Sequence, residues 1–174
     1  MSKLSHYIDF SIIAKEGTHE LMAILFSRLH RRLWDLNSDR IGVSFPEYSL
    51  NPCTVGNYLR VHGSATDLEE LMVASWLRGF THHLEVSSIR EAPATTTFAR
   101  WARGENAGCA IARRMYRERG EVYRRNLRLP HLYIGSRSSR QARYRFGIRR
   151  IESPETGGAF NTFGLSRTAT VPIF

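Results

Sequence analysis

The stretch HYIDFSIIAKEGTHELMAILFSRLHRRLWDL, residues 6–36, predicts a β-strand followed directly by a long helix. In its first residues, apolar Ile8, Phe10 and Ile12 alternate with more polar side chains, which is typical of a strand buried on one face. Gly17 and Thr18 then begin a helix. Its leucines recur every fourth residue, at Leu21, Leu25, Leu29 and Leu33. One apolar stripe of this helix therefore faces a core, as in a mixed α+β protein.

The segments that follow complete a recognisable order. RIGVSFP (40–46) and NYLRVHGS (57–64) are predicted strands, the second with Leu59 and Val61 directed inward. A helix over 67–80 is predicted to begin at a capping box formed by Thr66 and Glu69, and HLEVSSIRE (83–91) is a further strand. The order strand, helix, strand, strand, helix, strand predicts a ferredoxin-like, or RRM-like, domain.

A break in this pattern divides the chain. The stretch APATTT (92–97) is rich in proline and threonine, so we expect a domain boundary there, with domains over 1–93 and 94–174. In the second half, ENAGCAIARRMYRERG (105–120) predicts an arginine-rich helix that ends at Gly120. HLYIG (131–135), RYRFGIRRI (143–151) and TATVPIF (168–174) have the character of strands.

The charge of the chain favours a polyanionic partner. The formal net charge is +9, and of 25 basic residues only Lys3 and Lys15 are lysines. Residues 100–150 alone hold fifteen arginines and three glutamates. Arginine presents a planar fork of donors to phosphates and guanine edges, so this concentration indicates nucleic-acid binding. The alternative is a solvated basic face that serves only solubility.

The expected RNA-binding element is the arginine-rich helix and not the sheet. A sheet-face reader of single strands needs exposed aromatic side chains in a defined strand motif, and NYLRVHGS lacks that motif. The helix offers four arginines that could line a groove and contact phosphates or guanine edges. These are Arg113, Arg114, Arg117 and Arg119.

Other functional classes receive no support from the sequence. No segment approaches the roughly 20 apolar residues that span a bilayer, and the N-terminus has no secretory signal pattern. Cys53 and Cys109 match no ligand spacing, which favours a reduced, cytoplasmic protein. His82 and His83 are adjacent, which indicates surface residues. We therefore expect no metal, no cofactor and no membrane partner.

One histidine, His30, is a candidate catalytic residue. At about 100° per residue, His30 falls between apolar Phe26 and Leu33 on one side and polar Ser27 and Arg31 on the other. It is therefore predicted at the rim of the buried face. The simplest interpretation is a packed or surface side chain. The alternative is a general base, because a histidine near neutral pH is able to accept a proton.

Several motifs together resemble a known family. LMAILFSRLHRRL (21–33), DRIGVSFP (39–46), the arginine-rich helix and GGAFNTFGLS followed by VPIF (157–166 and 171–174) are similar to the CRISPR repeat-RNA processing endoribonucleases of type I-F systems. The resemblance implies a second, distorted ferredoxin-like half. It implies that the stem-loop of a precursor CRISPR RNA is cut just 3′ of the stem without metal. It also implies that the product stays bound, as part of a surveillance complex with other subunits such as its backbone protein.

The resemblance assigns roles to individual residues. The family's catalytic histidine falls on His30, and the serine that holds the attacking 2′-hydroxyl falls on Ser136, with Ser138 as the alternative. Phe163 stands where the family has a tyrosine, so a hydroxyl is missing there. Cleavage by the RNA's own 2′-hydroxyl leaves a 2′,3′-cyclic phosphate and a 5′-hydroxyl.

Further roles concern RNA recognition. The family's base-reading arginine and glutamine match Arg103 and Glu105. Because a carboxylate only accepts hydrogen bonds, adenine readout by an amide is lost at the second position. Tyr144 matches an aromatic ring that stacks under the last base pair of the stem, and in the helix Arg114 and Arg117 match best.

Two alternatives to an endoribonuclease stay open at this point. The first is a module that holds a structured RNA within a CRISPR ribonucleoprotein without cutting it, and the departures at Phe163 and Glu105 keep this alternative open. The second is a DNA-binding architectural protein.

Overall fold

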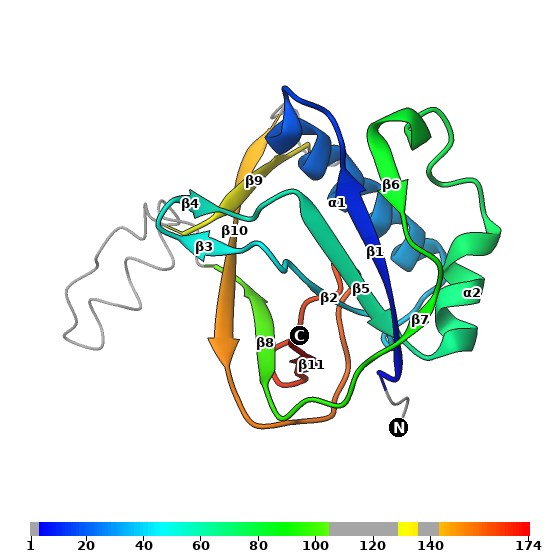
Figure 1. Cartoon of the computed structure of the whole chain (residues 1–174), viewed down its shortest axis with the longest axis vertical. Helices are drawn as coiled ribbons and strands as arrows, with labels where there is room; N and C mark the ends of the chain where they lie inside the picture. Colours follow the sequence, from blue (N-terminus) through cyan, green and yellow to red (C-terminus); the bar gives the residue numbers. More distant parts are fainter. Residues whose placement is uncertain (1–3, 105–128, 136–142) are drawn as a thin grey trace.

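The computed structural model describes residues 4–104, 129–135 and 143–174, and the remaining residues are drawn in grey in Figure 1. The described chain is a mixed α+β structure with antiparallel sheets. Its first half contains β1 (His6–Ile12), α1 (Thr18–Asp35), β2 (Gly42–Ser44), β3 (Ser49–Leu50), β4 (Cys53–Thr54), β5 (Tyr58–Gly63), α2 (Ala65–Val73), the 3-10 turn η1 (Thr81–His83), β6 (Leu84–Val86) and β7 (Arg90–Glu91). The second half contains β8 (Phe98–Arg103), β9 (His131–Ile134), β10 (Tyr144–Glu152) and β11 (Val171–Pro172).

The first sheet has the strand order β2-β5-β1-β6, with β7 paired to the start of β1. This antiparallel order is compatible with a ferredoxin-like arrangement, with the short β3–β4 hairpin inserted between β2 and β5. The alternation predicted for β1 is confirmed, because Ile8, Phe10 and Ile12 are all buried. Leu59 and Val61 of β5 are likewise fully buried, as expected.

The bounds predicted for the second helix, 67–80, were wrong at both ends. The capping residue is Ser64, whose hydroxyl accepts a hydrogen bond from the backbone N–H of Asp67 at 3.1 Å, and not Thr66. The helix ends at Val73 and not at residue 80, since Ala74 is extended. Arg32 of α1 donates to the carbonyl oxygens of Glu70 and Leu71, which satisfies helix-end acceptors that a further turn would otherwise use.

The last strand of the first half is also interrupted. The predicted strand over 83–91 is divided into β6 and β7. Between them, Ser87 takes part in local bonds with Asp9: its N–H donates to the Asp9 carbonyl, and its hydroxyl accepts from the Asp9 N–H. The second of these bonds uses a side chain where a regular ladder uses a backbone carbonyl, so the pairing is broken there.

The second sheet has the order β11-β8-β10-β9. Strands at 131–134, 144–152 and 171–172 confirm the three that the sequence predicts, whereas β8 was missed. Only Ala99 and Trp101 of β8 are buried, so its apolar signal is short. The predicted helix over 105–120 lies outside the described residues.

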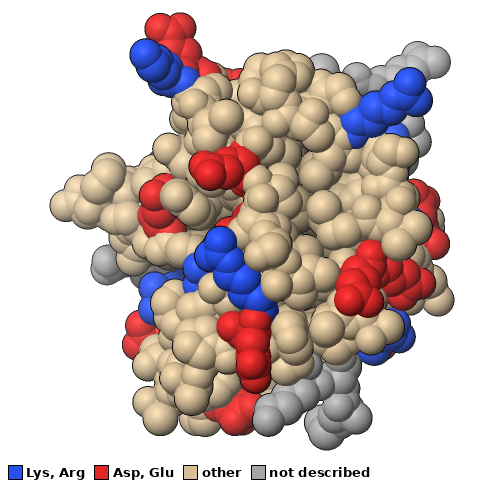
Figure 2. Space-filling model, turned by 45° about the vertical axis from the view of Figure 1, so that its right-hand side comes forward, with Lys and Arg blue, Asp and Glu red and all other residues tan. Residues whose placement is uncertain are grey.

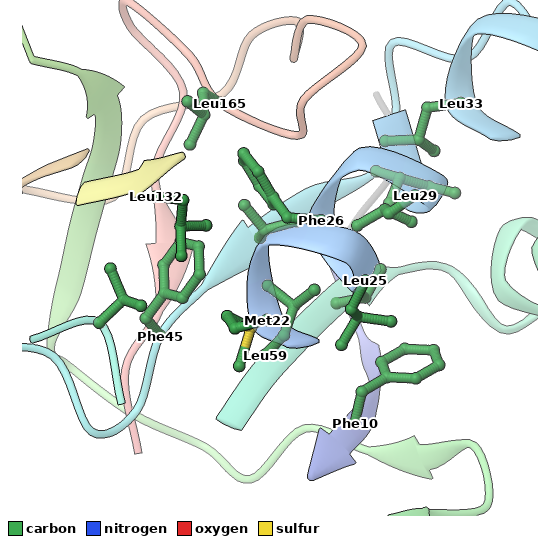
Figure 3. Close-up of a cluster of buried hydrophobic side chains, with 14 of the residues drawn as sticks. Phe10, Met22, Leu25, Phe26, Leu29, Leu33, Phe45, Leu59, Leu132 and Leu165 are labelled. Carbon is green, nitrogen blue, oxygen red and sulfur yellow. The ribbon is translucent and has the colours of Figure 1, made fainter. Parts of the chain in front are cut away.

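A single hydrophobic cluster joins the two sheets. It includes Ile8 and Phe10 of the first sheet together with Leu132 and Ile148 of the second. Helix α1 lies between them: Figure 3 shows Phe26 directed toward Leu165 and Leu132, while Leu25 lies close to Phe10. The core of the described chain therefore extends across both halves, and the boundary between 1–93 and 94–174 stays a prediction. Among the described residues, neither helix combines the length and the apolar character that crossing a bilayer requires.

One buried histidine gives the fold a pH dependence. His62 of β5 is fully buried, and its Nε2 lies 2.8 Å from the hydroxyl oxygen of Ser44. Burial, aided by the charge of Arg60, lowers the pKa of His62 to about 3. An unfolded chain binds a proton at this ring near its ordinary pKa of 6.5. The folded state is therefore fully favoured above pH 6.5 and loses stability as the pH falls toward 3.

We expect the free energy of unfolding to fall by about 2 kcal/mol between pH 7.5 and pH 5.0 because of His62 alone. Urea unfolding of the wild type and of His62→Gln at both pH values measures it. The variant should lose about 2 kcal/mol less than the wild type over this interval, and its other titrating groups cancel in the comparison. Equal losses would show that His62 binds a proton as readily in the folded state as in the unfolded chain.

Candidate active site

His30 lies on α1 at the edge of the buried face, as the sequence predicts, and its side chain is half-buried. Its Nδ1 is 3.0 Å from the backbone carbonyl oxygen of Thr162. Because a carbonyl only accepts, Nδ1 must carry the hydrogen. In the neutral ring Nε2 is then unprotonated, and within the described part of the chain it has no hydrogen-bond partner. The geometry therefore leaves Nε2 able to accept a proton.

A second contact fixes the plane of the His30 ring. The ring of Phe163 stacks on it, with 3.7 Å between centroids and 2° between planes. Phe163 also packs against Phe26 and Phe146, at centroid distances of 5.5 and 4.8 Å. The imidazole is thus held by a hydrogen bond at one nitrogen and by an aromatic face, so its orientation is set before any substrate binds.

The loop that supplies these contacts is itself held in place. The side-chain oxygen of Asn161 accepts from the backbone N–H groups of Phe163 and Leu165, at 2.9 and 3.1 Å. Gly164 has a φ of +70°, and a Cβ there would lie 2.6 Å from a side-chain carbon of Val43. Only glycine fits this position. The glycine in the sequence Phe-Gly-Leu-Ser therefore fixes the loop against β2, facing His30.

Two further predicted site residues, Arg103 and Tyr144, are linked to His30 through contacts between aromatic rings. The guanidinium of Arg103, at the end of β8, stands 4.9 Å from the ring centroid of Phe146 and 5.6 Å from that of Tyr144. Phe146 thus connects Arg103 and Tyr144 on one side with Phe163 and His30 on the other. The structure brings these four predicted residues together, and Phe146 is a member that the sequence analysis missed. Its signal was its place two residues after Tyr144, on the same face of β10.

The other predicted site residues lie outside the described part of the chain. They are Glu105, Arg113, Arg114, Arg117, Arg119, Ser136 and Ser138. Their roles stay predictions. The described residues that flank the two segments are Gly104 and Leu129 for the first, and Gly135 and Arg143 for the second.

A second histidine–serine pair is structural. His62 and Ser44 are 2.8 Å apart, which is a distance suited to general-base activation of a hydroxyl. Both side chains are buried, with exposed fractions of 0% and 3%. No substrate reaches these side chains, so we interpret their hydrogen bond as a structural link between β2 and β5 and not as part of an active site.

The described surface has little excess charge on the side that Figure 2 presents. There, around α2 and β6, basic and acidic side chains are interspersed and form no large patch of one sign. Nine of the fifteen arginines in residues 100–150 lie outside the described residues. The predicted arginine-rich face therefore stays a prediction. Within residues 4–104, 129–135 and 143–174, no three His, Cys, Asp or Glu side chains gather closely enough to hold a metal ion.

Comparison with known proteins identifies relatives of the whole chain. A CRISPR-associated endonuclease Cas6/Csy4 from Pseudomonas aeruginosa (strain UCBPP-PA14) is 30% identical over 188 residues, covering 98% of this chain and 100% of the relative. A protein of the same name from Escherichia coli (strain UTI89 / UPEC) is 29% identical over 189 residues, with the same coverage of both chains. A family model described as CRISPR-associated protein (Cas_Csy4) matches residues 7–174. The family that the sequence motifs resemble is thereby confirmed, and the chain belongs to the Cas_Csy4 family of CRISPR-associated proteins.

Proposed function

We propose that this protein is a metal-independent endoribonuclease that binds the stem-loop of a CRISPR repeat and cuts the precursor RNA at the 3′ base of the stem. The observation that carries the proposal is the arrangement of His30. Its Nδ1 is committed to the Thr162 carbonyl and its ring is stacked on Phe163, which leaves Nε2 as an oriented acceptor. The endonuclease names of the two relatives support the same reaction class.

The chemistry follows from what an oriented imidazole does next to RNA. Nε2 of His30 takes the proton of the 2′-hydroxyl, and the 2′-oxygen forms a bond to the adjacent phosphorus. The bond from phosphorus to the 5′-oxygen of the next nucleotide breaks, and that oxygen takes up a proton from water, while His30 gives the proton it accepted back to the solvent, so that the protons balance. The products are a 2′,3′-cyclic phosphate and a 5′-hydroxyl. Nearby guanidinium groups stabilise the charge on the phosphorus oxygens as the bonds exchange.

Ser136, or Ser138 in its place, is proposed to hold the attacking hydroxyl. Phe163 has no hydroxyl and serves by positioning the imidazole. The stem is proposed to end over Tyr144, whose half-buried ring lies below the Arg103 guanidinium. Arg103 and Glu105 then face the base of the stem.

The arginine-rich helix is proposed to bind the groove of the RNA stem. Its four arginines are Arg113, Arg114, Arg117 and Arg119, and phosphate and guanine contacts suit their donor forks. This part of the proposal includes two ferredoxin-like halves, over 1–93 and 94–174, the second distorted.

We further propose a cytoplasmic protein that keeps its product and joins the backbone protein and other subunits of a type I-F surveillance complex.

Cleavage without metal tests the proposal directly. Purified protein incubated in EDTA with RNA carrying its own repeat is expected to cut once, directly 3′ of the stem. Mass spectrometry of the upstream fragment should show a 2′,3′-cyclic phosphate, and the downstream fragment should accept a 5′ phosphate from a kinase. A requirement for Mg²⁺, or a 3′-hydroxyl on the upstream fragment, would contradict the mechanism.

One observation favours a second function. Because Phe163 replaces a tyrosine of the family, its position beside His30 supplies no proton donor or acceptor. A protein that binds the hairpin without cutting it, as an RNA-holding subunit of the complex, fits that departure. In the same EDTA assay it would bind the repeat RNA tightly and leave it intact.

A further inference from the structure

A groove of about 720 Å³ runs along the outward side of α1. Its floor is formed by α1 residues such as Ser27 and Arg31. One wall is the segment after α2, residues 74–76, and the other is Tyr133 of β9 with Arg143. Helix α1 packs against β9, so the second wall is fixed to the floor (Figure 1). No role proposed above uses this groove.

The groove passes beside His30, whose neighbours Ser27 and Arg31 line it, on the side away from the proposed stem site. Along α1, Phe26 lies to one side of His30, and Phe163 packs against both. Ser27 and Arg31 lie to the other side, where they line the groove. Tyr144 and Arg103 connect to His30 through Phe146 and Phe163, hence from the Phe26 side. A strand that leaves the stem and passes His30 therefore comes next to the groove.

The groove lining has an excess of positive charge. Arg28 donates to the carbonyl oxygens of Trp76 and Arg78, and Arg32 to those of Glu70 and Leu71. Carbonyl groups are neutral, so both guanidinium charges persist. Arg31 and Arg143 are exposed and, in the part of the chain that the structure describes, have no acidic partner. The four lining arginines outnumber the lining acids Glu20 and Asp35.

Two large exposed rings accompany these charges. The exposed fraction of Tyr133 is 48%, and the ring is braced by edge contacts with His19 and His131, at 6.2 and 5.1 Å between centroids. The exposed fraction of Trp34 is 69%, the highest among the described Phe, Tyr and Trp side chains. Trp34 does not itself line the groove, but it lies one helical turn after His30 and three residues after Arg31, on the same side of α1 and therefore next to the groove. Exposed rings between cations are the pattern that binds single-stranded nucleic acid.

We infer that this groove binds the single-stranded RNA immediately 3′ of the cleavage site, with a base stacked on Trp34 and its phosphates near Arg31 and Arg143. The inference rests on the proposed function, because it takes His30 as the point of cleavage. Binding the downstream strand holds the leaving nucleotide in line with the attacking 2′-oxygen. It also distinguishes the precursor, which has this strand, from the product, which does not.

The experiment compares two hairpin RNAs that carry a 2′-deoxy nucleotide before the cut and so remain intact. One ends one nucleotide after the cut and the other continues with six uridines. The extended RNA is expected to bind about tenfold more tightly and to quench the fluorescence of Trp34. Trp34→Ala should remove most of this added affinity, and Trp34→Phe should keep part of it without the quenching. Arg31→Gln should make the salt dependence of the added affinity shallower, by about 0.7 for each phosphate that the side chain no longer neutralises.

Matched controls come from exposed residues on other surfaces. Leu50→Ala on β3 and Arg90→Gln on β7 are expected to leave the roughly tenfold difference between the two RNAs unchanged. An octamer of uridine alone, at higher concentration, is expected to quench Trp34 as well. If the hairpin binds but the extension adds neither affinity nor quenching, the groove inference is wrong and the proposed function stands. If the hairpin does not bind but the octamer still quenches Trp34, the proposed function is wrong and the groove binds single strands independently.

Discussion

Replacing His30 by alanine is expected to lower the rate of RNA cleavage by about 10²- to 10⁴-fold, which is the usual contribution of a positioned general base. The physical reason is the loss of the oriented Nε2, which the Thr162 carbonyl and the Phe163 ring hold in place. The affinity for the hairpin should change little, because the proposal assigns the stem to Tyr144, Arg103 and the arginine-rich helix and not to His30. Single-turnover cleavage in EDTA and filter binding measure the two quantities on the same preparation.

Two controls separate catalysis from structural damage. His82→Ala removes an exposed histidine of η1, which supplies no residue to the proposed active site, and is expected to keep the wild-type rate. In the wild type, deoxyribose at the nucleotide before the cut should prevent cleavage without preventing binding, since the nucleophile is missing. A His30→Ala variant that cuts at the wild-type rate would transfer the role of base to another group. A variant that loses binding together with cleavage would show that His30 holds the RNA.

Replacing Phe26 by alanine is expected to lower the free energy of unfolding by about 3–5 kcal/mol. The side chain is 1% exposed and its ring contacts those of Phe45, Phe146 and Phe163, at centroid distances of 5.8, 5.7 and 5.5 Å. These partners come from both halves of the chain. The cavity would therefore weaken the contact between the two sheets and also the support of the ring that stacks on His30.

Urea unfolding followed by far-UV circular dichroism and by tryptophan fluorescence measures this loss. Both probes should report one transition in the wild type, because Trp101 and the α1 helix share one core. Ile24→Ala on the exposed side of the same helix is the control and should change the free energy of unfolding by no more than about 0.5 kcal/mol. A loss near that of the control would mean that Phe26 does not join the halves. Two separate transitions would mean that the halves unfold independently.

The elements that could be predicted well are those with a strong local pattern. The alternation in β1 and the leucine spacing in α1 are properties of neighbouring residues, and the structure confirms both. The end of α2 was not predictable in this way. It depends on Arg28 and Arg32, which lie on another helix and donate to carbonyl groups near and beyond Val73. Strand β8 was missed because only two of its six residues are buried.

Motif spacing and side-chain chemistry are local properties, and they were enough to indicate the family, the α+β character and His30 as the candidate base. How that ring is held depends on the tertiary structure. The carbonyl that fixes its tautomer belongs to Thr162, 132 residues away, and the stacking ring belongs to the next residue. Likewise, Arg31 and Tyr133 are far apart along the chain, and it is the packing of α1 against β9 that places them along one groove. Contacts between distant segments form only when the whole core assembles, so no local pattern encodes them.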